Sequence, residues 1–558
     1  MKKKILFMAS LVGAMMLTAC SSEDNSAEQG GQVDVAKGIT FQFSEEAFVP
    51  GVIGDKETQG TRVGMQPQSV DLGNGLVAEM SIEPDTAGTP QTRAPQLMSD
   101  GHYKIYAVDA NNVRHNGLSG TITAGVFTPD VAGQQWQLKS GETYTFVCIN
   151  DAVTDNGTSL TVSYTAQNAM IGVTQHTVST TIDKDVVAFE MKHQQPRVRY
   201  QITSYTAPCV GAKINFASDS GSGWGTENFN LRGQSTGLGN NGFLNGDDIP
   251  MTSTATVEYS PYVKAHKVST PYQYYAEGSN LRYIQFFSFN GNLHGKDLAT
   301  ETTAGFTLRS KISSMTNAAA TIHKNHSYVV NIKLKSKDPL LLFNDNTVGY
   351  LGDKGARTPI GIVYREKTNT QQGVAMGLHG TVQEWEATTS PTYNGNNYTT
   401  AFANSDDALQ DENGYNWTWT SSTDVDGLVK ANQQTRYPAF YWASHDPYGV
   451  GFGEWYFPAI GEIINVFDKL AKKTNVSSMY VTFEKKLKVI KDAFENAGGT
   501  NPLEYRSWSS TIYAYPGFSS PIVLYKSGGY DGYNIVVRPQ GAQKSHLTRI
   551  QTYPFVRF

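Results

Sequence analysis

Two groups of side chains in this sequence have the residue types that bind metal ions. His323 and His326 lie three positions apart, a spacing that can bring two imidazoles to one ion. A second group carries oxygen donors of the kind that calcium prefers, and it comprises Asn404, Asp406, Asp407, Asp411, Glu412 and Asn413. Neither histidine has a carboxylate nearby in sequence, and the oxygen donors do not match the spacing of an EF-hand. We therefore expect no metal site and no cofactor, with two solvent-facing histidines and a solvated acidic loop; bound calcium is the alternative for that loop.

Two catalytic motifs are absent from the sequence. It contains no His-Glu-x-x-His pair and no phosphate-binding loop. Gly449, Gly451 and Gly453 have the wrong spacing for a dinucleotide loop, and they indicate a loop where two backbone segments approach closely. We expect a binding protein rather than an enzyme.

Cys20 is the residue whose position indicates covalent chemistry. A lysine-rich start and a short apolar run occupy residues 2–17, and Thr18 and Ala19 then lead to Cys20. This is the layout of a secretory signal peptide, and the run is shorter than the roughly 20 residues of a membrane-spanning helix. The ending resembles the bacterial lipobox, which implies that Cys20 is acylated, for example with palmitate, and anchors the chain in the cell outer membrane. Cleavage by an ordinary signal peptidase is the alternative.

Composition narrows the class of protein. The chain has 558 residues, a net charge of −5, 53 glycines, 30 tyrosines and 17% charged residues. These values favour a β-rich extracellular protein of several domains and give no basic surface for nucleic acid. Beyond Cys20 only Cys148 and Cys209 remain, and they are either two buried thiols or one disulfide bridge.

The first two thirds of the chain alternate apolar and polar residues. A polar tether at 21–36 is followed by segments with period two, and these include residues 39–43, 76–82, 144–148, 198–202 and 328–334. No amphipathic helix precedes about residue 450. We therefore predict two antiparallel β-sandwich domains, at 37–195 and 196–339, with the boundary near residues 193–196.

The last third has a different pattern. A strand is predicted at 358–364, and apolar residues from Ile460 to Leu470 follow helical spacing after Pro458. A second apolar stripe runs from Phe483 to Phe494 and ends at Gly498 and Gly499, which predict a helix C-cap. Residues 340–558 should therefore form a separate α+β domain.

Two stretches of the chain resemble known families. Residues 76–84, 92–94, 102–108, 141–150, 189–202 and 326–334 resemble, in this order, segments of the fimbrillin superfamily, the pilus subunits of Bacteroidales. That resemblance implies a pair of transthyretin-like β-sandwiches that polymerise by strand exchange. Residues 455–462 (WYFPAIGE), 506–511 (RSWSST) and 553–558 (YPFVRF) resemble C-type-lectin-like domains related to the sulfatase-modifying factor. Enzymes of that fold depend on cysteines, and residues 340–558 contain none.

Tryptophans give the candidate ligand contacts. Trp455 and Trp508 lie in the motifs that carry the lectin-like resemblance, so we expect them in the core. Trp417 and Trp419 are two residues apart and are predicted on one face of a strand, and Trp385 lies in a polar region. Exposed aromatic rings stack on sugars or fill protein pockets, so Trp385, Trp417 and Trp419 are the tentative ligand-binding residues, with core packing as the alternative.

The resemblances together imply an adhesive subunit at the tip of a cell-surface fimbria. Such a subunit accepts a strand from the next subunit, because the C-terminal domain occupies the place of the strand that a shaft subunit donates. Its expected partners are other fimbrial subunits and a glycan or protein on a host or bacterial surface. Arginine-specific cleavage would mature the precursor, at Arg62 or at Arg93. The alternative is a lipid-anchored surface glycan-binding protein that does not polymerise.

Overall fold

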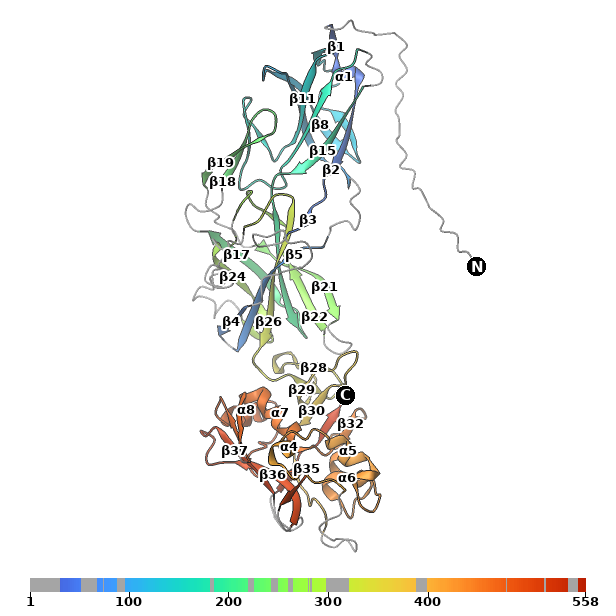
Figure 1. Cartoon of the computed structure of the whole chain (residues 1–558), viewed down its shortest axis with the longest axis vertical. Coiled ribbons are helices and arrows are strands. Elements are labelled where there is room, and N and C mark those ends of the chain that lie inside the picture. Colours follow the sequence, from blue (N-terminus) through green and yellow to red (C-terminus); the bar gives the residue numbers. More distant parts are fainter. Residues whose placement is uncertain are drawn as a thin grey trace, which may run out of the picture. The chain divides into compact units, whose positions relative to one another are not determined.

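A computed structural model gives the arrangement of the chain (Figure 1). It describes residues 31–51, 68–73, 75–87, 96–180, 185–218, 225–241, 249–258, 264–279, 281, 284–297, 321–387, 399–477, 479–515, 518–539 and 550–558. Cys20, Arg62 and Arg93 lie outside these residues. The chain divides into two compact units, the first formed by residues 1–48, 88–195 and 225–240 and the second by the remainder. Both units are mainly β, as predicted.

The first unit is built on an eight-stranded sheet with the order β6-β2-β15-β14-β11-β7-β8-β9. In that order the strands are Gln96–Leu97, Ile39–Glu45, Asp185–His193, Met170–Thr177, Thr143–Asn150, Gly101–Val108, Arg114–Thr123 and Val126–Pro129. β1 (Gln32–Asp34) pairs with β10 (Gln137–Lys139), and α1 (Val35–Gly38) lies between β1 and β2. A further sheet contains β12 (Thr154–Asp155), β13 (Leu160–Val162), β18 (Gly225–Phe229) and β19 (Ser235–Asn241).

Both faces of β11 are buried. Tyr144, Phe146 and Cys148 face one core, and Val147 and Ile149 face a second core that includes Phe229 of β18. The alternation in sequence therefore predicted the strand, but the odd-numbered residues of β11 are covered as well. Such two-sided burial gives the sheet two apolar layers.

The N-terminal half of the second unit is also a sandwich. One sheet has the order β21-β22-β16-β26-β5-β4, and β3 and β23 pair at its middle. Its strands are Thr252–Glu258, Lys264–Ser269, Arg197–Tyr205, His326–Ser336, Leu76–Pro84 and Gln68–Gly73, with β3 at Val49–Pro50 and β23 at Gln273–Tyr274. The other sheet joins β20 (Ile249–Pro250), β17 (Val210–Ser218), β24 (Ile284–Leu293) and β25 (Lys296–Asp297).

Sheet pairing corrects the predicted contents of the two sandwiches. Residues 76–82 were expected in a sandwich at 37–195, but β5 pairs with β26, with Met80 opposite Ile332. Residues 49–87 belong to the second unit, and residues 225–240 belong to the first. The predicted boundary near 193–196 does coincide with a change of unit. Period-two alternation identifies a strand but carries no information on its partner, which here lies some 250 residues away.

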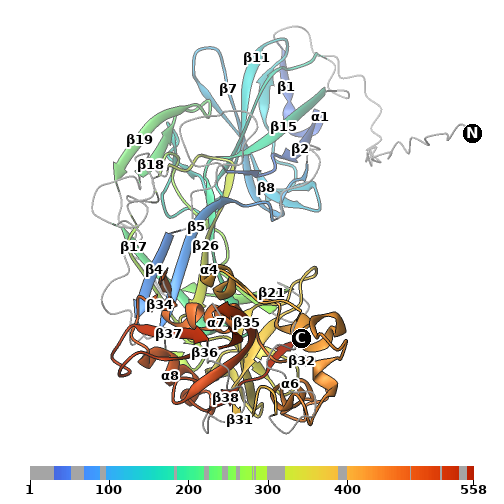
Figure 2. The same ribbon diagram turned by 60° about the horizontal axis from the view of Figure 1, so that its bottom comes forward.

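The C-terminal part of the second unit has two sheets of its own (Figure 2). The first has the order β28-β27-β29-β30-β39-β32, with the strands Val348–Gly349, Leu341–Phe343, Pro359–Arg365, Val374–Gly377, Phe555–Arg557 and Glu454–Tyr456. The second has the order β31-β38-β35-β36-β37-β34-β33, with the strands Thr381–Val382, Ile550–Thr552, Arg506–Tyr515, Phe518–Lys526, Asn534–Pro539, Tyr480–Phe483 and Lys473–Ser477. The predicted strand at 358–364 is β29.

Helices of this part differ from the prediction in two respects. α7 (Ile460–Ala471) follows Pro458 as predicted, but α8 (Lys488–Asn496) begins after Phe483, which lies in β34. Gly498 has φ +87°, and it ends α8 as expected of a C-cap glycine. Three helices, α4 (Ser405–Leu409), α5 (Gly414–Trp419) and α6 (Pro438–Ser444), occur before residue 450, where none was expected. They are too short to show a helical period in sequence.

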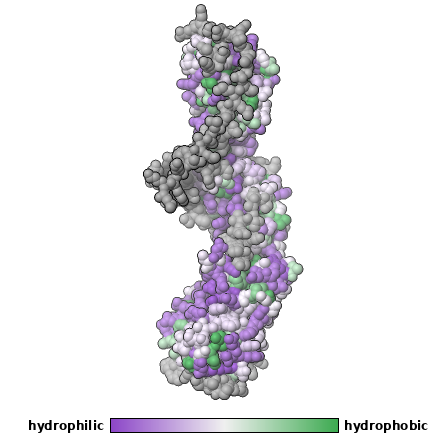
Figure 3. Space-filling model, turned by 90° about the vertical axis from the view of Figure 1, so that its right-hand side faces the viewer, coloured by the Kyte–Doolittle hydropathy of each residue, from purple (hydrophilic) through white to green (hydrophobic). Residues whose placement is uncertain are grey.

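Other expectations concern cysteines and the surface. Cys148 and Cys209 are free and buried, so the unbridged alternative is confirmed. Within the described ranges, no helix is both long enough and apolar enough to cross a membrane. Outside the grey atoms, the face in Figure 3 is mostly hydrophilic, with hydrophobic residues in small patches.

Candidate functional site

Trp385 is a core residue of the C-terminal part. Its side chain is fully buried, and its Nε1 donates a hydrogen bond to the carbonyl oxygen of Ser509 at 2.9 Å. Its ring meets Tyr437 and Phe440 edge to face, with centroids 6.0 and 5.0 Å away. These contacts hold the indole rigidly, and the alternative of core packing is correct for this residue.

Trp417 and Trp419 lie on a helix rather than on the predicted strand. Residues two apart on α5 point in different directions, so they do not share a face. Nε1 of Trp417 donates to Oδ2 of Asp411, and Nε1 of Trp419 donates to the carbonyl oxygen of Trp455, both at 2.8 Å. Both side chains are half-buried. The Trp-Thr-Trp pattern matches the two-residue period of a strand by chance. The six residues of α5 are too few to distinguish that period from the 3.6-residue period of a helix.

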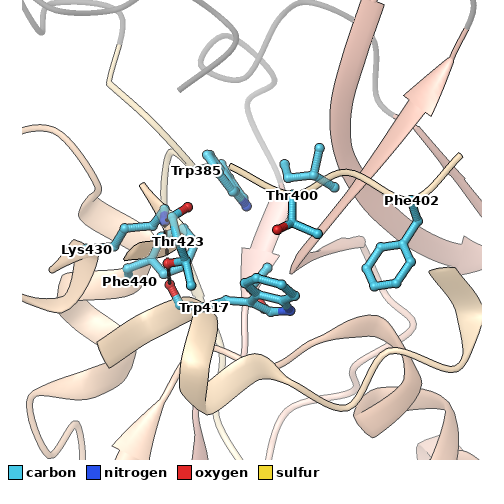
Figure 4. Close-up of a pocket in the computed structure, with 9 residues that line it drawn as sticks. Trp385, Thr400, Phe402, Trp417, Thr423, Lys430 and Phe440 are labelled. Carbon is cyan, nitrogen blue, oxygen red and sulfur yellow. Dashed lines mark hydrogen bonds between the residues drawn. The ribbon is translucent and has the colours of Figure 1, made fainter. Parts of the chain in front are cut away.

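The structure brings Trp385 and Trp417 together at one pocket, without Trp419 (Figure 4). The pocket is small: its cavity volume is about 10 Å³, room for one water molecule, within about 280 Å³ of empty space that includes open solvent. Its other lining residues are Thr400, Phe402, Thr423, Lys430, Phe440, Ser510 and Ile512. Aromatic walls combined with a few polar groups are typical of small-ligand sites. The pocket is therefore the candidate binding site of the C-terminal part.

Lys430 gives the pocket a buried cation that sequence reasoning missed. Its Nζ donates to the carbonyl oxygen and the Oγ1 of Thr423, at 2.8 and 2.9 Å. The same Nζ lies 5.8 Å from the ring centre of Tyr437 and 6.0 Å from that of Phe440. A lysine in a polar stretch normally faces solvent, so only the surrounding aromatic rings could have indicated its position.

An ionic network lies beside this lysine. Tyr437 donates its hydroxyl hydrogen to Asp424, and burial raises the pKa of Tyr437 well above its ordinary value. Nη2 of Arg436 lies 2.7 Å from Asp426, and its Nε lies 3.6 Å from buried Glu386. The tyrosine therefore stays a hydrogen-bond donor at physiological pH, and its ring packs against Trp385 and Phe440, two residues that line the pocket.

The expected acidic loop is partly a helix. Asn404 caps α4, because its Oδ1 accepts from the backbone N–H of Asp406 at 2.8 Å. Asp411 is buried, and its Oδ2 accepts hydrogen bonds from Trp417 and, at 2.7 Å, from Thr511 Oγ1. In the ranges described above, no three His, Cys, Asp or Glu side chains are grouped to hold a metal ion. The expectation of a fully solvated loop is thus wrong for Asp411.

The two histidines expected at a turn have identified partners. His323 Nδ1 lies 3.0 Å from Oε1 of Glu277, and His326 Nδ1 lies 2.8 Å from the carbonyl oxygen of Lys324. Glu277 is 46 residues away in sequence, so the fold supplies a carboxylate partner that the neighbouring sequence does not contain. The side chain of His323 is more than half exposed, as predicted.

The motif at 455–462 forms β32 and the start of α7. Trp455 and Trp508 are buried, as expected of core residues. Glu462 is buried at the beginning of α7, where its Oε2 accepts from the N–H of Ala459 at 2.9 Å and its Oε1 from the hydroxyl of Tyr456 at 2.6 Å. Burial raises the pKa of Glu462 to about 8. Gly453 has φ +82°, and a Cβ there would lie 2.4 Å from the side chain of Val556 and 3.1 Å from the carbonyl oxygen of Arg557. The expected close approach is therefore found at Gly453 but not at Gly449 or Gly451, where a Cβ would meet open space.

Comparison with known proteins gives solved structures but no sequence match. No protein-family model matches the chain, and no curated protein does. A proposed cell adhesion protein from Bacteroides ovatus is 12% identical over 53% of this chain and 92% of its own, with a TM-score of 0.29. A second proposed cell adhesion protein, from Bacteroides fragilis, is 12% identical over 53% of this chain and 92% of its own, with a TM-score of 0.28. The fimbrial anchor protein Mfa2 from Porphyromonas gingivalis is 11% identical over 44% of this chain and 86% of its own, with a TM-score of 0.20. Similarity this low carries no argument about this chain, and none of the following rests on it.

Proposed function

We propose that this protein is an adhesive tip subunit of a cell-surface fimbria. Its precursor is exported and lipid-anchored through Cys20, and the C-terminal domain at 340–558 binds a glycan or protein ligand. The lipobox-like sequence and the order of fimbrillin-like segments support surface location and assembly. The ligand-binding role rests on one observation, the pocket where Trp385, Trp417 and Lys430 meet.

Blocking this pocket tests the binding role. Thr400 is exposed at the pocket lining, so Thr400→Trp should fill its mouth without disturbing buried Trp385. Thr370→Trp is the matched control, because Thr370 is also exposed in this domain and does not line the pocket. On a glycan array and in an adhesion assay, the full chain and the control should bind alike, and Thr400→Trp should lose at least tenfold in affinity. Equal binding by all three proteins would remove the pocket from the proposal.

Assembly is proposed to proceed by strand exchange after cleavage. β2 lies between β6 and β15, and its Phe41 and Phe43 stack on Phe189 of β15 with centroids 6.2 and 5.8 Å away. Cleavage after Arg62 would release β2, and also β3, which pairs with β26. Cleavage after Arg93 would release β5 as well. A vacated apolar groove with unpaired backbone groups can accept a strand from another subunit.

Protein sequencing distinguishes the two cleavage sites. Limited trypsin digestion of the precursor should give a new N-terminus at Val63 or at Ala94. The double variant Arg62→Ala, Arg93→Ala should accumulate as an uncleaved precursor that does not enter fimbriae. Normal entry of that variant would favour the surface glycan-binding protein that does not polymerise.

A further inference from the structure

Three neighbouring strands of the C-terminal part place a tyrosine between two arginines. The guanidinium carbon of Arg506, at the start of β35, lies 5.2 Å from the ring centre of Tyr525 on β36. The guanidinium carbon of Arg538 on β37 lies 5.1 Å from the same ring. Both distances fall within the range of cation–π attraction.

Register puts these side chains on one face of the sheet. Ser507 pairs with Leu524, so Arg506 is opposite Tyr525, and Tyr525 pairs with Val536 on β37. Val536 in turn pairs with Tyr480 on β34. Directly opposed residues of antiparallel strands point to the same face, and so do residues two apart on one strand. We call Arg506, Tyr525, Arg538 and Tyr480 the arginine–tyrosine platform.

The platform is accessible. Arg538 is exposed, Tyr480 is 48% exposed, and Arg506 and Tyr525 are half-exposed, whereas Val536 beneath them is buried. Among the residues that the structure places, no carboxylate lies within ion-pair distance of Arg538. An arginine with no carboxylate partner among these described residues is available to an anion from outside.

A second cation–π cluster in the same domain differs from the platform because carboxylates neutralise its charge. Lys526 and Lys491 lie over Tyr530, at 3.8 and 5.2 Å from its ring centre. Here carboxylates balance the charge, because the hydroxyl of Tyr530 donates to Glu504 at 2.6 Å and Lys491 pairs with Glu495 at 3.7 Å. That cluster is satisfied within the fold and needs no ligand.

We propose that the platform binds an acidic sugar chain through its carboxylate groups, as in a polymer of uronic acids. A guanidinium donates two parallel hydrogen bonds to a carboxylate, and the exposed ring of Tyr480 offers a flat surface to a sugar ring. The same face continues along β35 past buried Trp508 to Ile512, which lines the pocket described above. Trp508 and Ile512 are buried in the core, so this stretch of the face is covered and the platform is a site separate from the pocket. This inference rests on the proposed ligand-binding role of the C-terminal domain.

The experiment uses oligogalacturonate and its fully methyl-esterified form as probes, because esterification removes the carboxylate charge and keeps the sugar backbone. The full chain should bind the acid form, with affinity falling as salt rises, and should bind the ester at least tenfold more weakly. Arg538→Gln should lower affinity for the acid form about tenfold, and Arg538→Lys should lower it less, since lysine keeps the charge but not the paired donors. Lys354→Gln, which removes one exposed charge elsewhere in this domain, should have no effect.

Each other outcome would overturn the inference. Equal binding of acid and ester would show recognition of the sugar without its charge, and would leave the proposed adhesive function in place. Polyglutamate binding as tightly as oligogalacturonate would make the platform a general anion site. Loss of binding in Arg538→Gln counts only if its melting temperature matches that of Lys354→Gln, and the exposed Tyr480→Ala provides a second variant, for which about a threefold loss is expected. Binding of neither probe would exclude the platform, whereas the pocket variant Thr400→Trp tests the adhesive function independently.

Discussion

Glu462 shows how one buried residue supports the C-terminal domain. Its carboxyl group links the N-terminus of α7 to β32 through Ala459 and Tyr456. Gly414 at the start of α5 is also close, since a Cβ there would lie 2.4 Å from Oε2 of Glu462. Three elements therefore contact this side chain, and its replacement should lower the stability of the whole domain.

Removing the carboxyl group should destabilise the domain. Glu462→Ala leaves the N–H of Ala459 and the hydroxyl of Tyr456 buried without partners, which should lower the free energy of unfolding by about 3 kcal/mol. Glu462→Gln keeps an acceptor for the N–H and should retain most of the stability. Urea denaturation followed by tryptophan fluorescence measures both changes, and an alanine variant as stable as the wild type would contradict this role.

The same residue should make stability depend on pH. The pKa of Glu462 is raised to about 8 in the folded protein, from an ordinary value of 4.5. Between these values the folded state holds the proton and the unfolded state does not, so stability falls as pH rises, by up to about 1.4 kcal/mol per pH unit. The difference in melting temperature between pH 5 and pH 7.5 should shrink in Glu462→Gln. An unchanged difference would assign the pH dependence to other groups.

At the scale of elements, β2 is the strand whose packing bears on assembly. Phe41 packs against Phe189 and, with its centroid 6.3 Å away, against Trp136, so it joins β2 to two other segments of the first unit. Phe41→Ala should lower the free energy of unfolding by about 2 kcal/mol, less than for a fully buried phenylalanine because this ring is half-buried. Gln42→Ala, on the exposed side of the same strand, should change it by less than about 0.5 kcal/mol. Denaturant titration of both variants checks the difference.

The sequence predicted strands better than it predicted their partners. The alternating residues of β2, β5, β11, β16 and β26 identified all five strands, because successive side chains of a strand point to opposite faces. The parallel pairing of β16 with β26 and the membership of β5 depend on contacts between distant segments, which no local pattern encodes. The pocket illustrates the same limit. Two of its tryptophans were selected by residue type, but Lys430 enters it only through packing among aromatic rings.

At the scale of the whole molecule, residues 340–558 should fold without the rest of the chain. Both sheets of this part are formed from its own strands, and a core cluster from Leu341 to Phe555 lies entirely within it. A protein comprising 340–558 should therefore give a single cooperative melting transition. If it were soluble only when residues 196–339 were attached, the domain boundary would be wrong.

The proposed lipid anchoring of the precursor is also tested on the whole chain. Cys20→Ala should abolish metabolic labelling with palmitate and leave a larger precursor, because no other cysteine follows a lipobox-like sequence. Cys148→Ala is the control, since that thiol is buried and free in β11. Unchanged labelling of the Cys20 variant would favour ordinary signal-peptide cleavage.

The pairing of β5 with β26 has a consequence for how fast the protein reaches its native state. Met80 meets Ile332 only when the roughly 250 residues between them have been delivered. At a synthesis rate of about 5–20 residues per second, this takes on the order of 10–50 s. Throughout that delay β5 can pair with β4 along one edge, but its other edge, which pairs with β26 in the native sheet, stays unpaired. An unpaired strand edge is a template for aggregation. The precursor should therefore depend on a holding chaperone during export, and refolding of the second unit should be slow and concentration-sensitive.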